Sequence, residues 1–267
     1  MALDLRSCEA KFRRSKEHAD AFRRESKLWM DGNPYGVSTK TNSDCTRHSL
    51  IAHLVGPDAP FEQWTLIVSD CLQNLRASLD HLLYAIAIHE SSKDPPPKHD
   101  KIMFPICDLP DNFVTSNWRI EMLSLGVRTA IEGVQPYNRQ YPTIPPPLTM
   151  LRELTNADKH RLLRLAYAST YKGDLSFSGQ KVGNLKSIFA NQGEVEDGAE
   201  IAAFEFDVPN RDMKYDRINL EVAVVLWHGK KDPLGPEWSE RSDCSALLTL
   251  ITNEVRHVID TVVKEVI

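Results

Sequence analysis

A stretch of 30 residues without proline or glycine, Phe61 to Glu90, is the feature that most constrains how this chain can fold. Its apolar residues recur every three or four positions, which is the period of an amphipathic helix. They are Trp64, Val68, Cys71, Leu75, Leu79, Leu82 and Ile86. Pro60 suits the first turn, where its missing N–H is not needed. At about 1.5 Å per residue, the helix would be about 45 Å long and could cross a whole domain.

Two more long helices are predicted at the ends of the chain. In residues 1–30, apolar and small residues alternate in steps of three and four, which gives a heptad-like seam. A last helix over 239–266 would begin near Ser239 or Ser242, since both are suitable caps. Its apolar stripe is Leu248, Ile251, Val255, Val258 and Val262. Such a valine-rich helix needs docking against a neighbour for stability.

The remaining segments alternate between short helices and strands. Residues 35–55 read as a β-hairpin, because two strand-like runs flank the polar Thr41-Asn42-Ser43-Asp44. Short helices are predicted over 112–124, 127–133 and 149–158. Between 161 and 230, short apolar runs separated by glycines and by Pro209-Asn210 predict an antiparallel meander.

These elements predict one α+β domain over residues 1–267, in which long amphipathic helices pack on an antiparallel β meander. Residues 1–160 would be mainly helical with the 35–55 hairpin, 161–230 would form the meander, and 239–266 would be the C-terminal helix.

The composition is that of an ordinary globular protein, with 42% hydrophobic and 26% charged residues. The net charge of −5 gives no global attraction to nucleic acid or anionic lipid. No apolar run approaches the roughly 20 residues that cross a membrane, so we expect no membrane partner. The five cysteines are scattered and form no CxxC pair. Together with an early charged N-terminus, they predict a cytoplasmic protein.

A first polar cluster lies on the long helix. Asn74, Ser78 and His81 are spaced by four and three residues, so they share one line beside the apolar stripe. Arg76 and Asp80 are four residues apart on the other side and are predicted to pair. Arg76 and His81 diverge by about 140° around the helix axis, so they converge on one ligand only across the helix or with a second chain.

A second polar cluster consists of Asn156, Asp158, Lys159, His160 and Arg161, at the end of a predicted helix. Such residues commonly satisfy free carbonyls and the helix dipole at a C-terminus. They also complement the first cluster in charge, so we predict that the two clusters are neighbours and form a polar pocket.

A metal site is one alternative for these residues. Asp80, His81, Asp158 and His160 carry suitable ligand groups. However, consecutive Asp and His residues on a helix diverge by about 100°, and the spacing matches no known metal motif. We therefore predict no metal and no cofactor.

The segment Arg76-Ala-Ser-Leu-Asp-His81 resembles the Arg, four to six residues, His motif of the HEPN superfamily. Members of that family are helical and are often ribonucleases of toxin and antiphage systems, in which Arg and His of two protomers commonly meet at a dimer interface. Ala77 departs from the polar residue that often follows the Arg. More broadly, LRASLDHLLYAI, FPI and LTNADKHRLL are similar to a group of bacterial proteins with an ALDHL-type helix and a DNxDKHR-type segment, a resemblance that implies no particular activity.

The HEPN resemblance implies a metal-independent endoribonuclease with RNA as substrate and a homodimer as the active form. His81 would be the general acid or base, and Arg76 would balance the charge developing on the phosphate. Lys159, Arg161 and Arg164 would bind flanking phosphates.

The other hypothesis is a non-enzymatic binding or interaction protein. Buried polar groups must be hydrogen-bonded, so both clusters can be a structural network that connects helices. The sequence leaves the two hypotheses open.

Overall fold

The computed structural model describes residues 1–32, 34–139, 145–160, 163–169, 176–178, 185–190, 195–211, 213–217, 222–227 and 243–267. The chain divides into two compact units. The first unit comprises Met1–Arg23, Glu62–Arg164 and His228–Ile267, and the second comprises Arg24–Phe61 and Leu165–Trp227. Helices together with an antiparallel sheet confirm the predicted α+β class.

The helices match the predicted segments closely. They are α1 (Arg6–Asp31), α2 (Phe61–Ser91), α3 (Pro110–Ser116), α4 (Leu125–Gly133), α5 (Pro147–Asp158) and α6 (Cys244–Val263), with 3-10 helices η1 (Asn117–Arg119) and η2 (Pro136–Asn138). The predicted 112–124 helix is wrong in its second half, because α3 ends at Ser116 and η1 and turns follow. Only Phe113 of α3 is buried, and so short a helix depends on packing for stability.

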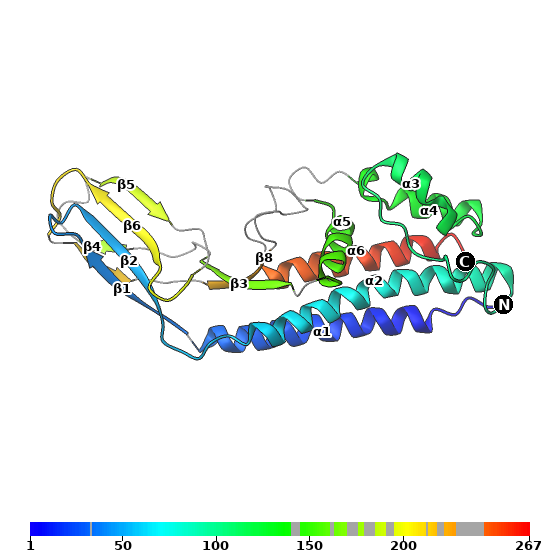
Figure 1. The fold of residues 1–267 in the computed structure, drawn as a ribbon, viewed down its shortest axis with the longest axis horizontal. Coiled ribbons are helices and arrows are strands. Elements are labelled where there is room, and N and C mark those ends of the chain that lie inside the picture. The colour runs from blue at the N-terminus through cyan, green and yellow to red at the C-terminus, as the bar shows by residue number, and fades with distance from the viewer. Residues whose placement is uncertain are drawn as a thin grey trace. The chain divides into compact units, whose positions relative to one another are not determined.

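The core of the first unit is built on α2 (Figure 1). The seven residues of its predicted apolar stripe are all at most 1% exposed. Helix α1 lies antiparallel beside α2, since Phe22 packs edge-on against Trp64 at one end and Ser7 contacts His81 at the other. Burial of this continuous stripe explains why a 31-residue segment is helical throughout.

Helix α6 docks on the same bundle through a charged contact and an apolar face. Both terminal nitrogens of Arg256 donate to Glu9 of α1, at 2.9 and 3.1 Å. Its valine-rich stripe is buried, as predicted. The helix begins at Cys244, and Asp243 caps it by accepting from the Ala246 N–H at 2.7 Å. The predicted cap residues Ser239 and Ser242 lie outside the described part of the chain.

The second unit carries a four-stranded antiparallel sheet in the order β1-β2-β6-β5. The predicted 35–55 hairpin is confirmed, with β1 (Tyr35–Thr41) paired to β2 (Arg47–Leu54). Strand β6 (Glu200–Phe206) lies between β2 and β5 (Leu185–Ala190). Its residues Ile201 to Phe204 are all buried and form the centre of this sheet with Leu50.

In a simple meander, each strand pairs with the next one along the chain. The other strands of this unit pair in a nested order instead. Strand β4 (Ser176–Ser178) pairs with β7 (Lys214–Arg217), and β3 (Arg164–Ser169) pairs with β8 (Val222–Trp227). These pairs enclose the β5–β6 pair in the sequence. Strand β8 lies near the end of the predicted 161–230 meander, and residues 218–221 before it lie outside the described residues. Apolar alternation predicts strands but not their partners.

Candidate functional site

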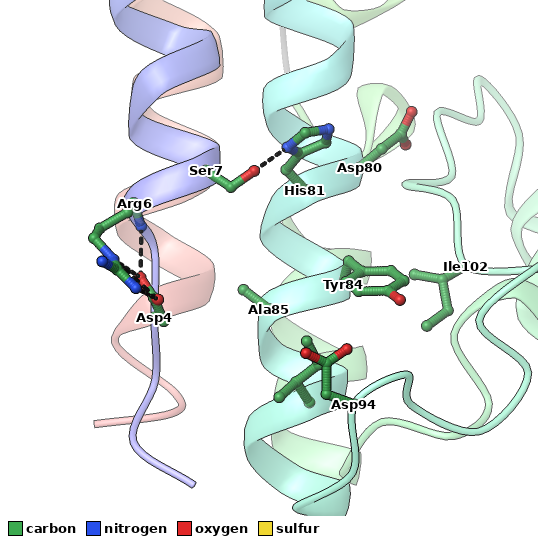
Figure 2. Close-up of a pocket in the computed structure, with 10 residues that line it drawn as sticks. Asp4, Arg6, Ser7, Asp80, His81, Tyr84, Ala85, Asp94 and Ile102 are labelled. Carbon is green, nitrogen blue, oxygen red and sulfur yellow. Dashed lines mark hydrogen bonds and ion pairs between the residues drawn. The ribbon is translucent and has the colours of Figure 1, made fainter.

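A pocket of about 750 Å³ opens beside His81 in the first unit (Figure 2). Its residues come from the start of α1, the second half of α2 and the chain that follows α2. They are Asp4, Arg6, Ser7, Asp80, His81, Tyr84, Ala85, Ile88, Asp94 and Ile102. The helical period places Asp80, Tyr84 and Ile88 on successive turns of one face of α2. The sequence did not predict this face as part of a site. Of all the residues that line the pocket, only Asp80 and His81 belong to the predicted polar clusters.

The pocket wall combines apolar and polar groups. Ala85, Ile88 and Ile102 supply aliphatic surface, and the ring of Tyr84 points toward Ile102 (Figure 2). His81 stands at the side nearest α1, where its Nδ1 is hydrogen-bonded to the Ser7 hydroxyl. An apolar wall with a few polar groups is the usual composition of a small-molecule site.

Two opposite charges on the pocket rim, those of Asp4 and Arg6, form an ion pair with each other. Arg6 donates to both carboxylate oxygens of Asp4, from Nε at 3.0 Å and from Nη2 at 2.6 Å. These hydrogen bonds lower the pKa of the Asp4 carboxyl to about 2. Asp4 and Arg6 therefore offset each other's charge at the rim.

Arg76 does not reach the pocket and is held elsewhere. Its Nη2 donates to the backbone carbonyl of Phe104 at 2.6 Å and lies 3.4 Å from Asp80 Oδ1. The same Asp80 oxygen accepts from the Phe104 N–H at 2.7 Å. The predicted pairing of Arg76 with Asp80 is confirmed. The pair also clamps both backbone polar groups of Phe104, a connection that the sequence did not indicate.

Burial dominates the electrostatics of this clamp. Desolvation raises the pKa of Asp80 and lowers the pKa of Arg76, and the charge of each partner opposes the shift of the other. The Arg76 side chain is only 16% exposed. A guanidinium in such a position has lost most of its hydration, so its hydrogen bonds to protein acceptors are needed to hold it there.

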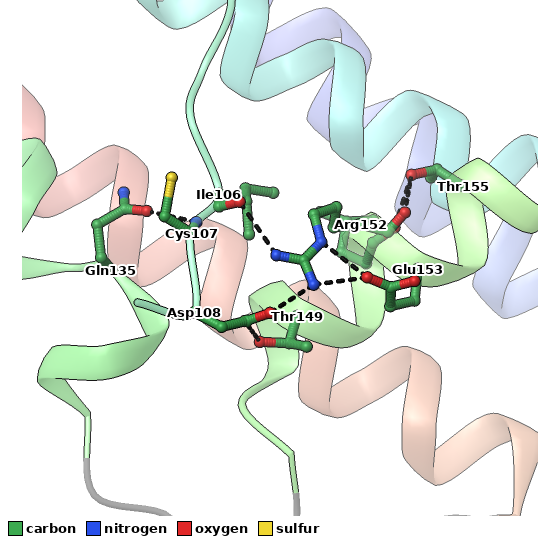
Figure 3. Close-up of polar contacts among 9 residues, drawn as sticks. Ile106, Cys107, Asp108, Gln135, Thr149, Arg152, Glu153 and Thr155 are labelled. Carbon is green, nitrogen blue, oxygen red and sulfur yellow. Dashed lines mark hydrogen bonds and ion pairs between the residues drawn. The ribbon is translucent and has the colours of Figure 1, made fainter. Parts of the chain in front are cut away.

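The clamp is the first of several that fix the extended segment after Phe104 (Figure 3). Gln135, which is fully buried, donates to Pro105 O at 3.1 Å and accepts from Cys107 N at 2.9 Å. Arg152 of α5 donates to Ile106 O at 3.2 Å. This segment is extended and contains no residue assigned to a strand. Side chains therefore satisfy backbone groups that a neighbouring strand would otherwise satisfy.

The far end of this segment is anchored on α5. Asp108 accepts from Arg152 Nη2 and from the Thr149 hydroxyl, both at 2.5 Å. Arg152 also contacts Glu153 at 2.5 Å. The sequence did not single out Gln135, Arg152 or Asp108 as residues that hold this segment. The only feature that pointed to such a role was an apolar run interrupted by a proline, because the backbone of that run needed hydrogen-bond partners.

The second predicted cluster meets α2 through one residue. Asp158 accepts from the Ser69 hydroxyl at 2.5 Å and from Gln73 Nε2 at 2.9 Å, which ties the end of α5 to α2. Burial raises the pKa of Asp80, and the positive charge of Lys159 is among the groups that oppose this rise. The structure thus brings one residue of the second cluster, Asp158, into contact with α2, the helix that carries the first cluster.

The other cluster residues do not join the pocket. Asn156, Lys159 and His160 are exposed at the end of α5, and none is among the described residues that line the pocket. Arg161 lies outside the described residues.

The predicted line of Asn74, Ser78 and His81 does not form a single site either. Asn74 donates to Asp70 O at 2.8 Å, and the fully buried Ser78 donates to Leu75 O at 2.7 Å. Both are hydrogen bonds within α2, whereas the partner of His81 is Ser7 of α1. Of this line, only His81 faces the pocket.

Among the described residues, no three His, Cys, Asp or Glu side chains cluster in a way that could hold a metal ion. This part of the chain also contains no helix that is long and apolar enough to cross a membrane.

The chain matches no protein-family model, no curated protein and no solved structure. The resemblance of Arg76-Ala-Ser-Leu-Asp-His81 to the HEPN motif therefore stays a prediction, and a function has to be inferred from the geometry of the pocket and its neighbours.

Proposed function

We propose that this chain is a ligand-binding protein whose site is the pocket beside His81. The single observation that carries the proposal is that successive turns of α2 have different functions, one turn holding the backbone and the following turns lining a cavity. Arg76 and Asp80 are hydrogen-bonded to the Phe104 backbone, while the next turns of α2 line a cavity of about 750 Å³. That volume falls within the range of about 300–1,000 Å³ typical of small-molecule sites.

In this proposal, most of the predicted polar residues are structural. Arg76, Asp80 and Asp158 connect α2 to the extended segment and to α5. This agrees with the alternative hypothesis of a polar network that holds helices together. The ligand would be small and amphipathic, because Ile88 and Ile102 offer apolar surface beside the imidazole of His81 and the ring of Tyr84.

RNA cleavage by Arg76 and His81 has less support. That chemistry needs a guanidinium that can approach a phosphate, and Arg76 already donates to the Phe104 carbonyl. A polyanion in the pocket would also meet the carboxylates of Asp80 and Asp94. A HEPN-like dimer would have to supply its Arg from a second protomer.

The proposal is tested with tryptophol, a neutral molecule with an aromatic body and one hydroxyl, as a probe. Ala85 lines the pocket, so Ala85→Trp should fill part of it and weaken tryptophol binding about tenfold or more, the equivalent of about 1.4 kcal/mol. The matched control is Ala10→Trp, on an exposed position of α1. Dissociation constants would come from NMR titration, and thermal melts would check that both variants are folded.

Two results would contradict the proposed function. One is that the wild-type protein does not bind tryptophol up to its solubility limit. The other is that Ala85→Trp and Ala10→Trp bind it equally well, which would place the contact outside the pocket.

A further inference from the structure

We infer that the ligand of the His81 pocket carries a positive charge, such as a protonated amine, on its apolar body. This inference rests on the proposed binding function and specifies the chemistry of the ligand. It is drawn from the balance of charged groups along the wall, from the position of Asp94, and from the ring of Tyr84.

The charged groups on the wall leave an excess of carboxylate. Asp4 is neutralised by the two-pronged contact with Arg6. Asp80 is balanced on its buried side by Arg76, and Lys159 lies within electrostatic reach of it. Asp94 forms no ion pair in the described part of the structure, so its charge is left uncompensated at the pocket.

Asp94 and Tyr84 together suit an ammonium group. Figure 2 shows Tyr84 between Asp80 and Asp94 along the pocket, with the aliphatic side chain of Ile102 beside its ring. An ammonium group near Asp94 would form a charge-assisted hydrogen bond with the carboxylate and could lie near the face of the ring. The apolar part of the ligand would then contact Ile88, Ala85 and Ile102.

The same wall disfavours an anionic ligand. A carboxylate or phosphate would lose hydration in the pocket and face Asp80 and Asp94. On the wall, Asp4 already occupies the edge of the Arg6 guanidinium formed by Nε and Nη2. An anion would have to compete with Asp4 for that edge of the guanidinium.

Three probes of similar shape separate the effect of charge from the effect of apolar contact. Tryptamine carries an ammonium, tryptophol a hydroxyl, and indole-3-acetate a carboxylate on the same indole ring. We expect tryptamine to bind about twofold to fivefold more tightly than tryptophol, the range for exposed charge pairs. Indole-3-acetate should bind most weakly. The preference for the amine should shrink at high salt, because these charges are screened.

The variant Asp94→Asn identifies the carboxylate responsible. It should remove most of the preference for tryptamine over tryptophol, measured as the ratio of their two dissociation constants, because asparagine keeps the shape of the side chain and lacks its charge. The control is Asp111→Asn, an exposed carboxylate in the first turn of α3, which should behave as the wild type. Equal binding of all three probes would overturn the charge inference and keep the proposed function. Binding of none of them would overturn both.

Discussion

Replacing Arg76 with methionine should lower the free energy of unfolding by about 3–5 kcal/mol, the cost of removing one partner of a mostly buried ion pair. The methionine keeps much of the aliphatic packing, so the loss is that of the guanidinium. Phe104 O would lose its 2.6 Å donor, and Asp80 would lose its counter-charge. Urea unfolding measures the change directly. Leu75→Ala, a truncation of a fully buried side chain on the same helix, should cost about 2–5 kcal/mol.

Arg14→Met provides the matched control on α1. Arg14 is paired with Glu17 on the helix surface, where its side chain is 59% exposed. Exposed pairs contribute about 0–1 kcal/mol, so this variant should unfold close to the wild type. If Arg76→Met were as mild as Arg14→Met, the guanidinium of Arg76 would not be structural, and a role in binding phosphate would regain support.

Gln135→Leu should cost about 2–4 kcal/mol, because it strands buried backbone groups at about 1–3 kcal/mol each. The Gln135 side chain bonds Cys107 N, Pro105 O and Ile131 O, and it is fully buried. Leucine fills a similar volume but replaces none of these hydrogen bonds. The exposed Gln63 at the start of α2 offers the control substitution, Gln63→Leu, which should have a small effect.

Hydrogen exchange locates the effect of Gln135→Leu. The amide of Cys107 should exchange faster in the variant, because its acceptor at 2.9 Å is gone. An unchanged melt together with an unchanged exchange rate at Cys107 would mean that the extended segment does not depend on Gln135.

The features that the sequence predicted correctly are local. The long helix follows from the period of its apolar residues, and that period is the geometry of the helix itself. The pairing of Arg76 with Asp80 follows from their spacing of four. The 35–55 hairpin follows from two strand-like runs joined by a short polar connection. Each of these depends on residues close together in the chain.

The features that the sequence did not predict depend on distant residues. Ser7 and His81 are 74 positions apart, and Gln135 bonds a segment about 30 positions earlier. The pocket combines the start of α1, α2 and the chain that follows it, and no periodicity links Asp4 to Asp94. The resemblance to the HEPN motif directed attention to Arg76 and His81 as a pair, whereas the partners of Arg76 are Asp80 and the backbone carbonyl of Phe104.

One measurement tests most directly whether the Arg76–His81 motif is structural here rather than catalytic. Varied RNAs would be incubated with wild-type protein and with His81→Ala, in the presence and absence of EDTA, and both proteins would be melted in parallel. We predict no cleavage above background by either protein, and a small drop in melting temperature for His81→Ala, because its hydrogen bond to Ser7 is exposed. Cleavage by the wild type that survives EDTA and disappears in a fully folded His81→Ala protein would contradict this account.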